Sequence, residues 1–179
     1  MKHFLKDNFT GDSACYETSL QISENDKQYV FEFYAKNSTF YCPYKNYNEN
    51  LYEGDVCEVF IGDANDVSNY YEIEISPEGV IFLAKVYNDG GDTEESLHLT
   101  YLENDLLEVN TQKDGKNYLV KIAIDKKKLN LPLEKIAFNA FRIDTDGIKQ
   151  DLHLFSLNPT KSETFHKLGY FVMLKDYLK

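Results

Sequence analysis

The sequence predicts an all-β protein, an antiparallel β-sandwich of about ten strands in which a jelly-roll order is the favoured variant. Apolar and polar residues alternate with a period of two in several stretches, and turn-forming residues recur between these stretches. Helical periodicity is nearly absent: only DKKKLNLPLEK, residues 125–135, indicates a helical turn, which Pro132 cuts short. No linker or internal repeat interrupts the chain, so residues 1–179 are expected to form a single domain.

Three stretches show the alternation most clearly. In YVFEFYA (29–35) the odd-numbered residues form an apolar face, and in NYLVKIAI (117–124) the even-numbered residues do so. In NYYEIEI (69–75) the odd-numbered residues are apolar, whereas the other face carries Glu72 and Glu74. These are the patterns of half-buried antiparallel strands.

Shorter apolar runs predict the remaining strands in chain order. We expect them near residues 14–22, 55–62, 79–87, 105–112, 135–143, 151–156 and 169–175. The turn signals that separate strands are SPEG (76–79), NDGGD (88–92), KDGKN (113–117) and DTDG (144–147). Regular turns between short strands favour hairpin connections and therefore antiparallel sheets.

The charge of the chain excludes two classes of partner. With 19 Lys and Arg against 30 Asp and Glu, the net charge is −11. Phosphate would be repelled, so neither a nucleic acid nor an anionic membrane is an expected partner. The 14 Tyr and 12 Phe are numerous, and Trp is absent. Tyrosine suits a half-wet sheet face and also a polar-ligand site, because its flat ring carries a hydroxyl.

The three cysteines, Cys15, Cys42 and Cys57, have no metal-binding spacing and are expected to be free thiols. No apolar run is long enough for a signal peptide or a membrane span. The sequence as written therefore predicts a cytoplasmic protein, or a secreted one if an export signal has been removed. It carries no signal for an oligomeric state.

Carboxylates in predicted central strands are the most informative feature. In DVCEVFI, Glu58 shares a face with Val56 and Phe60, and both faces of this strand are mostly apolar. An isolated buried charge is costly, so Glu58 needs a partner. That partner is Arg142, a backbone amide or a ligand hydroxyl. The arrangement indicates either a polar-ligand site or a wet outer sheet face.

The order of these segments, from about residue 28 to 174, resembles the family 9 carbohydrate-binding modules. That family shows an aromatic residue before a Gly/Asp-Asp-x-x-Glu-x-Phe strand, then a YYEFEINPxG strand and turn, an N-x-x-R-I-D strand, and a W-S-P-T…F-H-x-P-x-x-F-G tail. The counterparts here are Tyr52, Asp55, Glu58 and Phe60; Tyr70 to Gly79; Asn139, Arg142, Ile143 and Asp144; and Asn158, Pro159, Thr160, Phe165, His166 and Gly169.

The resemblance implies a β-sandwich that binds saccharides and takes part in glycan catabolism without being catalytic. In the family, two tryptophans sandwich a terminal sugar while Glu, Arg and Asn side chains bind its hydroxyls. Here Tyr52 stands at the first tryptophan position and Leu157 at the second. The expected ligand-binding residues are Tyr52, Glu58, Glu72, Glu74, Asn139, Arg142 and Leu157.

Two other functions remain open. Loss of both tryptophans is compatible with a degenerate sandwich that acts as a structural or protein-interaction module. In that case side chains should fill the groove over Tyr52 and Glu58, whereas an open groove favours a sugar. Alternatively, Glu58 with Glu72 or Glu74 would form the acid and base of a small glycoside hydrolase.

Cofactor signals are sparse. His3, His98, His153 and His166 lack the spacing of a zinc site, and we expect no cofactor besides a structural Ca²⁺. Oxygen ligands for such an ion are concentrated in GDANDVSN (62–69) and DTDG (144–147), although neither matches the twelve-residue calcium loop. The candidate ligands are Asp63, Asp66, Asp144 and Asp146.

Overall fold

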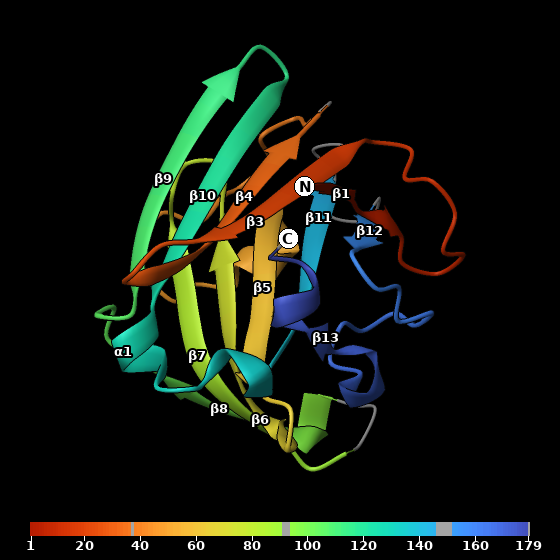
Figure 1. Cartoon of the computed structure of the whole chain (residues 1–179). Helices are drawn as coiled ribbons and strands as arrows, with labels where there is room; N and C mark the ends of the chain where they lie inside the picture. The colour runs from red at the N-terminus through yellow and green to blue at the C-terminus, as the bar shows by residue number, and fades with distance from the viewer. Residues whose placement is uncertain (37, 91–93, 146–151, 179) are drawn as a thin grey trace.

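The computed structural model describes residues 1–36, 38–90, 94–145 and 152–178 and shows two antiparallel sheets packed face to face (Figure 1). This confirms the predicted β-sandwich. The strands are β1 (Lys2–Phe4), β2 (Lys6–Asp7), β3 (Thr18–Glu24), β4 (Gln28–Ala35), β5 (Val56–Asp63), β6 (Asp66–Ile75), β7 (Ile81–Asn88), β8 (Leu97–Tyr101), β9 (Leu107–Asp114), β10 (Asn117–Asp125), β11 (Ile136–Thr145), β12 (Leu152–Ser156) and β13 (Val172–Met173).

The smaller sheet has five strands in the order β1-β3-β4-β10-β9. The larger sheet has eight, in the order β2-β12-β11-β5-β6-β7-β8, with β13 paired to one end of β11. The sequence pattern did not predict β1, β2 and β8. Each of these is short and lies in the outer part of its sheet, where strands bury few side chains and leave a weak alternation signal.

In the described residues, helical structure is limited to short turns. Residues 125–135, expected to form a helical turn, contain α1 (Lys126–Leu129) and the 3₁₀ turn η3 (Leu133–Lys135). Asp125 caps α1 by accepting from the backbone N–H of Lys128, and the left-handed Asn130 ends it. The other 3₁₀ turns are η1 (Leu51–Glu53), η2 (Glu94–Ser96), η4 (Leu168–Tyr170) and η5 (Leu174–Asp176).

The main core lies between the two sheets. The alternating faces predicted from the sequence supply it: Phe31 and Phe33 come from β4, and Val59, Ile61 and Ile73 come from β5 and β6. All five side chains are fully buried. Their removal from water is the main driving force for packing one sheet against the other.

A second apolar layer covers the opposite, outer face of the larger sheet. Phe60, Tyr70 and Phe141 project outward from this sheet and are buried. Phe165, from the segment after β12, stacks on Phe141 with a distance of 4.2 Å between ring centroids. Cys42 and the buried Leu51, from the segment between β4 and β5, belong to the same cluster. The larger sheet is therefore buried on both faces.

Two buried polar residues hold the covering segments in place. Asp55 accepts hydrogen bonds from Ser38 Oγ, the backbone N–H of Tyr41, and both the backbone N–H and Oγ1 of Thr145. These bonds tie the segment between β4 and β5 to the end of β11. A carboxylate with four donors is well satisfied despite its burial.

Asn8 plays the same role for the segment after β12. Its amide oxygen accepts from Ser156 Oγ and the backbone N–H of Thr160, and its amide nitrogen donates to the carbonyl of Ser162. The segment that leads to Phe165 is thereby joined to the N-terminal strands.

Two further findings concern the cysteines and the helices. Cys15, Cys42 and Cys57 are all free thiols. Among the helices that the structure describes, none has the length and apolarity needed to cross a membrane.

We expect Asp55→Asn to destabilise the protein by roughly 2–4 kcal/mol, because the amide replaces one acceptor oxygen by an NH₂ donor that faces other donors. The measurement is urea denaturation followed by circular dichroism. Asp114→Asn, at an exposed position on β9, is the matched control. Equal stability of the two variants would contradict the anchoring role of Asp55.

Candidate functional site

Three carboxyl groups meet on the outer face of the larger sheet, and strand register brings them together. Glu58 on β5 pairs directly with Glu74 on β6, and Phe60 pairs with Glu72. Side chains two residues apart on a strand share a face, so Glu72 and Glu74 both lie beside Glu58. Like charges directly opposite each other destabilise a sheet, which makes this pairing unusual.

All three carboxyl groups are buried. Glu58, Glu72 and Glu74 are 2%, 6% and 1% exposed. One carboxyl oxygen from each lies within 4.8 Å of one from the other two. Among the described residues, neither Oε1 of Glu58 nor Oε2 of Glu74 has a hydrogen-bond partner. The cluster is therefore not part of a wet outer sheet face, which was one of the two sequence-based alternatives.

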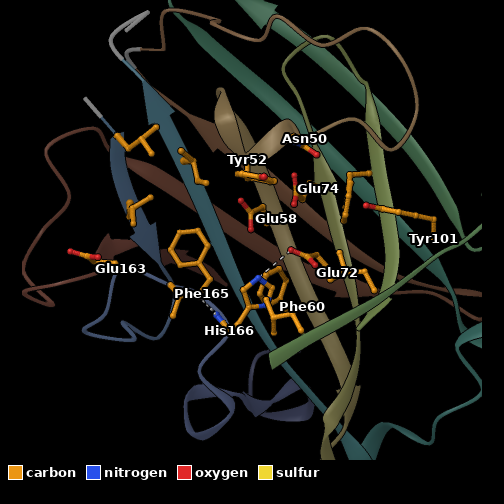
Figure 2. A pocket seen from close by; sticks show the side chains of 17 residues that line it. Asn50, Tyr52, Glu58, Phe60, Glu72, Glu74, Tyr101, Glu163, Phe165 and His166 are labelled. Atoms are coloured by element: carbon orange, nitrogen blue, oxygen red, sulfur yellow. Dashed lines mark hydrogen bonds and ion pairs between the residues drawn. The ribbon is translucent and has the colours of Figure 1, made fainter. Parts of the chain in front are cut away.

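A cavity of about 480 Å³ opens over this cluster. The buried carboxyl groups form its floor, and the exposed rings of Tyr52 and Tyr101 stand at its rim. Figure 2 shows the glutamates pointing toward one another below Tyr52, with Tyr101 on one side of the pocket and Glu163 on the other. The other lining residues are Asn50, Phe60, Phe82, Leu97, Leu99, Ile143, Leu152, Leu154, Thr164, Phe165 and His166.

Local geometry presents Tyr52 to the pocket. Tyr52 lies in the 3₁₀ turn η1, whose Leu51 side chain is fully buried and whose Tyr52 side chain is 44% exposed. Gly54 follows, and a Cβ at this position would lie 2.7 Å from the carbonyl oxygen of Tyr41. The turn is thus held in place by the buried side chain of Leu51 and by the close packing of Gly54 against the backbone of Tyr41. The backbone N–H of Tyr52 also donates to Glu74.

His166 closes the pocket opposite Tyr52. Its ring stacks on Phe60 with 4.9 Å between centroids, and its Nδ1 lies 2.6 Å from the hydroxyl of Tyr70. Burial raises the pKa of Tyr70, so its hydroxyl keeps its proton in this hydrogen bond with Nδ1. On the other side of the ring, Nε2 lies 3.6 Å from Oε1 of Glu72 (Figure 2).

Burial sets the charge state of the cluster. It raises the pKa of Glu72 to about 8 and raises the pKa values of Glu58 and Glu74 well above the usual range, with further repulsion from the neighbouring carboxyl groups. Burial also lowers the pKa of His166 to about 4, so at neutral pH this ring is uncharged. Its contact with Glu72 is therefore not an ion pair. None of the described lining residues is Lys or Arg.

The structure does not bring Arg142 into the pocket. Arg142 pairs with Cys57 across β11 and β5, and its side chain points into the sandwich, on the opposite face from Glu58. There it is fully buried, forms an ion pair with Asp144, and donates to Thr18 Oγ1 at 2.9 Å. The guanidinium also lies 5.6 Å from the ring centroid of Tyr118. Glu58 therefore does not have Arg142 as its partner.

Asn139 and Leu157 also lie outside the pocket. The amide nitrogen of Asn139 donates to the carbonyls of Asn158 and Tyr170, and its oxygen accepts from the backbone N–H of Asn158. Asn139 therefore holds the C-terminal segment in place. Leu157 packs against the main core. Of the seven predicted ligand-binding residues, Tyr52, Glu58, Glu72 and Glu74 line the pocket.

Sequence reasoning missed the wall that β8 supplies. Leu97, Leu99 and Tyr101 line the pocket from this strand, which pairs with β7. The alternation in LHLTY is visible in the sequence, but it covers only one short strand. That alternation could have indicated that these three side chains lie on one side of a strand. It could not have indicated that they line a pocket.

The loop aspartates are not gathered into a metal site in the described part of the chain. Asp63 accepts from the backbone and side chain of Asn65, and Asp66 accepts from the side chain of Asn69. Asp144 is paired with Arg142 inside the sandwich, and Asp146 lies outside the described residues. Among the described residues, the group of three acidic side chains close enough to share an ion is Glu58, Glu72 and Glu74.

Three solved structures superpose on nearly the whole chain. A candidate carbohydrate-binding protein from Bacteroides uniformis superposes with a TM-score of 0.73 and 15% identity, covering 96% of this chain and 84% of that one. A family 9 carbohydrate-binding module from Caldicellulosiruptor kristjanssonii in complex with cellotriose gives a TM-score of 0.68 and 9% identity, covering 96% and 79%. A module of the same family and organism in complex with glucose gives 0.64 and 9%, covering 94% and 81%.

Sequence similarity is more local. No family model matches the chain. An extracellular protein from Arthroderma benhamiae is 32% identical over 75 residues, which are 40% of this chain and 34% of that protein. The match thus spans about a third of the relative's length. The structural superpositions show that this chain has the fold of the family 9 carbohydrate-binding modules.

The buried glutamates should make stability fall as pH rises. A carboxyl group whose pKa is higher in the folded than in the unfolded protein favours folding in its protonated form. Its contribution to the free energy of unfolding is full below its pKa in the unfolded protein and is lost as the pH rises through its pKa in the folded protein. For Glu72 this window runs from 4.5 to about 8. Wild type should lose this contribution as the pH rises from 5 to 8, whereas Glu72→Gln has no carboxyl group to titrate at this position. The unfolding free energy of Glu72→Gln relative to that of wild type should therefore increase by roughly 2–4 kcal/mol over this range.

The measurement is urea denaturation at both pH values in buffer freed of divalent cations. Glu108→Gln, exposed on β9 in the other sheet, is the matched control and should follow wild type. If Glu72→Gln showed the same pH dependence as wild type, Glu72 would not be a buried carboxyl group with a raised pKa.

Proposed function

We propose that this chain is a non-catalytic carbohydrate-binding domain and that the saccharide binds in the pocket on the outer face of the larger sheet. One observation carries the proposal: exposed tyrosine rings at the rim stand over buried carboxyl oxygens that lack protein partners. A pyranose has the matching chemistry, with an apolar C–H face and hydroxyl groups around its edge. A cavity of about 480 Å³ is within the size range of small-molecule sites.

The rim supplies the apolar contacts. Tyr52 is 44% and Tyr101 58% exposed, and both present ring surface to the pocket. Leu99 and Leu152, at 38% and 42%, extend the apolar surface beside them. Covering such exposed apolar surface with a sugar ring gains free energy through the hydrophobic effect. Tyr101 occupies a role for which the sequence resemblance had suggested Leu157.

The floor supplies the polar contacts. An ionised carboxylate only accepts hydrogen bonds, whereas a protonated one also donates. Burial raises the pKa values of Glu58, Glu72 and Glu74, so the cluster retains protons near neutral pH. The cluster therefore offers both acceptors and a donor, and sugar hydroxyls use both. Asn50 adds a neutral amide at the same side of the pocket as Glu74 (Figure 2).

The structural neighbours support this assignment, since modules with the same fold are in complex with cellotriose and with glucose. We extend the proposal to a role in glycan catabolism, in which the domain holds a saccharide for breakdown by other proteins. The resemblance of the sequence to family 9 modules motivates this extension.

The two alternative functions fit the geometry less well. A pocket that stays open over Tyr52 and Glu58 disfavours a degenerate module whose groove is filled by side chains. In glycoside hydrolases, two carboxyl groups flank the scissile bond at about 5–9.5 Å, and in the retaining class one of them is an ionised nucleophile. Here the three groups adjoin one another on one sheet face, and burial raises the pKa of each.

The first test is Glu58→Gln. This change should weaken sugar binding by roughly 0.5–1.5 kcal/mol, because the amide NH₂ replaces a carboxyl oxygen that can accept a hydrogen bond from a sugar hydroxyl. Stability at pH 7 should not fall, because Glu58 has no ion-pair partner among the described residues. Calorimetric titration with glucose, cello-oligosaccharides and a wider glycan panel measures binding, and thermal melts measure stability. The proposal would be overturned if wild type bound none of these sugars with millimolar or tighter affinity.

The second test removes the stacking surface. Tyr52→Ala should reduce sugar affinity about five- to thirtyfold, because the loss of one aromatic contact costs on the order of 1–2 kcal/mol. Tyr87→Ala is the matched control: Tyr87 is 47% exposed on β7 and does not line the pocket. Equal loss of affinity in both variants would argue against stacking on Tyr52.

A further inference from the structure

The floor of the pocket is also a concentration of oxygen ligands. Glu58 on β5 pairs with Glu74 on β6. Glu72 lies two residues before Glu74 on β6, so its side chain is on the same face. Each contributes a carboxyl oxygen to a group whose members are all within 4.8 Å of one another. No Lys or Arg is among the described residues that line the cavity. Nothing positively charged in that part of the protein therefore compensates the cluster.

A second observation indicates that something else completes this group. Glu58 is 2% and Glu74 1% exposed, yet Oε1 of Glu58 and Oε2 of Glu74 have no hydrogen-bond partner in the described structure. Buried polar atoms are nearly always satisfied, and an orphaned carboxyl oxygen is among the costliest exceptions. Both side chains point into the shared space below Tyr52 (Figure 2).

We propose that Glu58, Glu72 and Glu74 form a binding site for a divalent cation of the Ca²⁺ type at the floor of the pocket. Ca²⁺ binds oxygen at about 2.3–2.6 Å, so two oxygens on opposite sides of one ion are about 4.6–5.2 Å apart. Three oxygens within 4.8 Å of one another can share such an ion without rearrangement of the sheet. The bound cation displaces the protons that these carboxyl groups otherwise hold and offsets the repulsion between the ionised groups.

The ligand set selects among cations. Carboxylate oxygens suit Ca²⁺, Mg²⁺ and Mn²⁺, whereas Zn²⁺ and Cu²⁺ favour nitrogen and sulfur ligands. Ca²⁺ accepts six to eight oxygens in flexible geometry, so three glutamates that bind in mono- or bidentate fashion leave positions for other oxygens. The cavity above the cluster gives access for them. This site differs from the loop aspartates that the sequence had suggested.

The open positions face the place where the proposed sugar binds. Two neighbouring hydroxyls of a sugar can fill them, so the ion would link the protein to its ligand. This consequence rests on the proposed carbohydrate-binding function, whereas the cation site itself does not. Calcium binding and sugar binding are therefore measured separately.

The experiment is titration of the chelator-treated full chain with CaCl₂, followed by calorimetry and by the shift in melting temperature. Saturable binding and a melting temperature that rises with Ca²⁺ are expected, since an ion that binds only the folded state stabilises it. Glu58→Gln and Glu74→Gln should each raise the dissociation constant for Ca²⁺ at least about tenfold. Both substitutions replace a buried carboxyl group by a neutral amide of nearly the same shape, so these variants should fold.

Glu108→Gln, exposed on β9, should bind Ca²⁺ as wild type does. No saturable binding to wild type, or equal binding to wild type and both cluster variants, would overturn the cation site. Titration with glucosamine tests an organic ammonium as the occupant: glucosamine binding that depends on Glu58, with no Ca²⁺ binding, would also overturn it.

Sugar titrations with and without Ca²⁺ separate the two proposals. Ca²⁺ binding without any sugar binding leaves the cation site standing and overturns the proposed function. Sugar binding that needs Ca²⁺ supports both. Sugar binding that is unchanged by chelator, together with Ca²⁺ binding at the glutamates, supports the site and overturns the link between ion and sugar.

Discussion

The register between β5 and β6 is the constraint on which the site depends. Because Glu58 lies opposite Glu74, every outward side chain of β5 meets an outward side chain of β6. A slip of β6 by one residue would turn Glu72 and Glu74 into the main core, bring Ile73 out of it and separate both glutamates from Glu58. The apolar inner face fixes this register, since Val59, Ile61 and Ile73 are fully buried between the sheets. The hydrophobic core thereby determines where the carboxyl groups stand.

The segments that cover the outer face of the larger sheet bury these carboxyl groups, and this burial raises their pKa values. The segments anchored by Asp55 and Asn8 cover the outer face of the larger sheet, and Phe165 and His166 pack against its side chains. Glutamates on an uncovered sheet would remain hydrated and ionised. Here burial raises their pKa values and leaves two oxygens unsatisfied, which turns an ordinary polar face into a site that favours a ligand.

Arg142 illustrates how the same two strands serve stability and binding separately. It lies on β11 next to β5, but its side chain enters the sandwich and joins Asp144, Thr18 and the ring of Tyr118. Arg142 thereby connects the larger sheet to Thr18 and Tyr118 of the smaller one, and loss of Asp144 would leave an uncompensated buried charge. Asn139 likewise organises the C-terminal segment through backbone carbonyls.

The sequence by itself determined the β-sandwich, most of its strands and the outward glutamates, because period-two alternation is a local property that follows from strand geometry. Residue parity also separates Asn139 from Arg142, since positions three apart on a strand lie on opposite faces. The pairing of strands, the cover over the outer face and the position of Tyr101 beside the pocket were decided only by tertiary structure. These features depend on contacts between segments far apart in the chain, and no local pattern encodes which distant segment fills a given space.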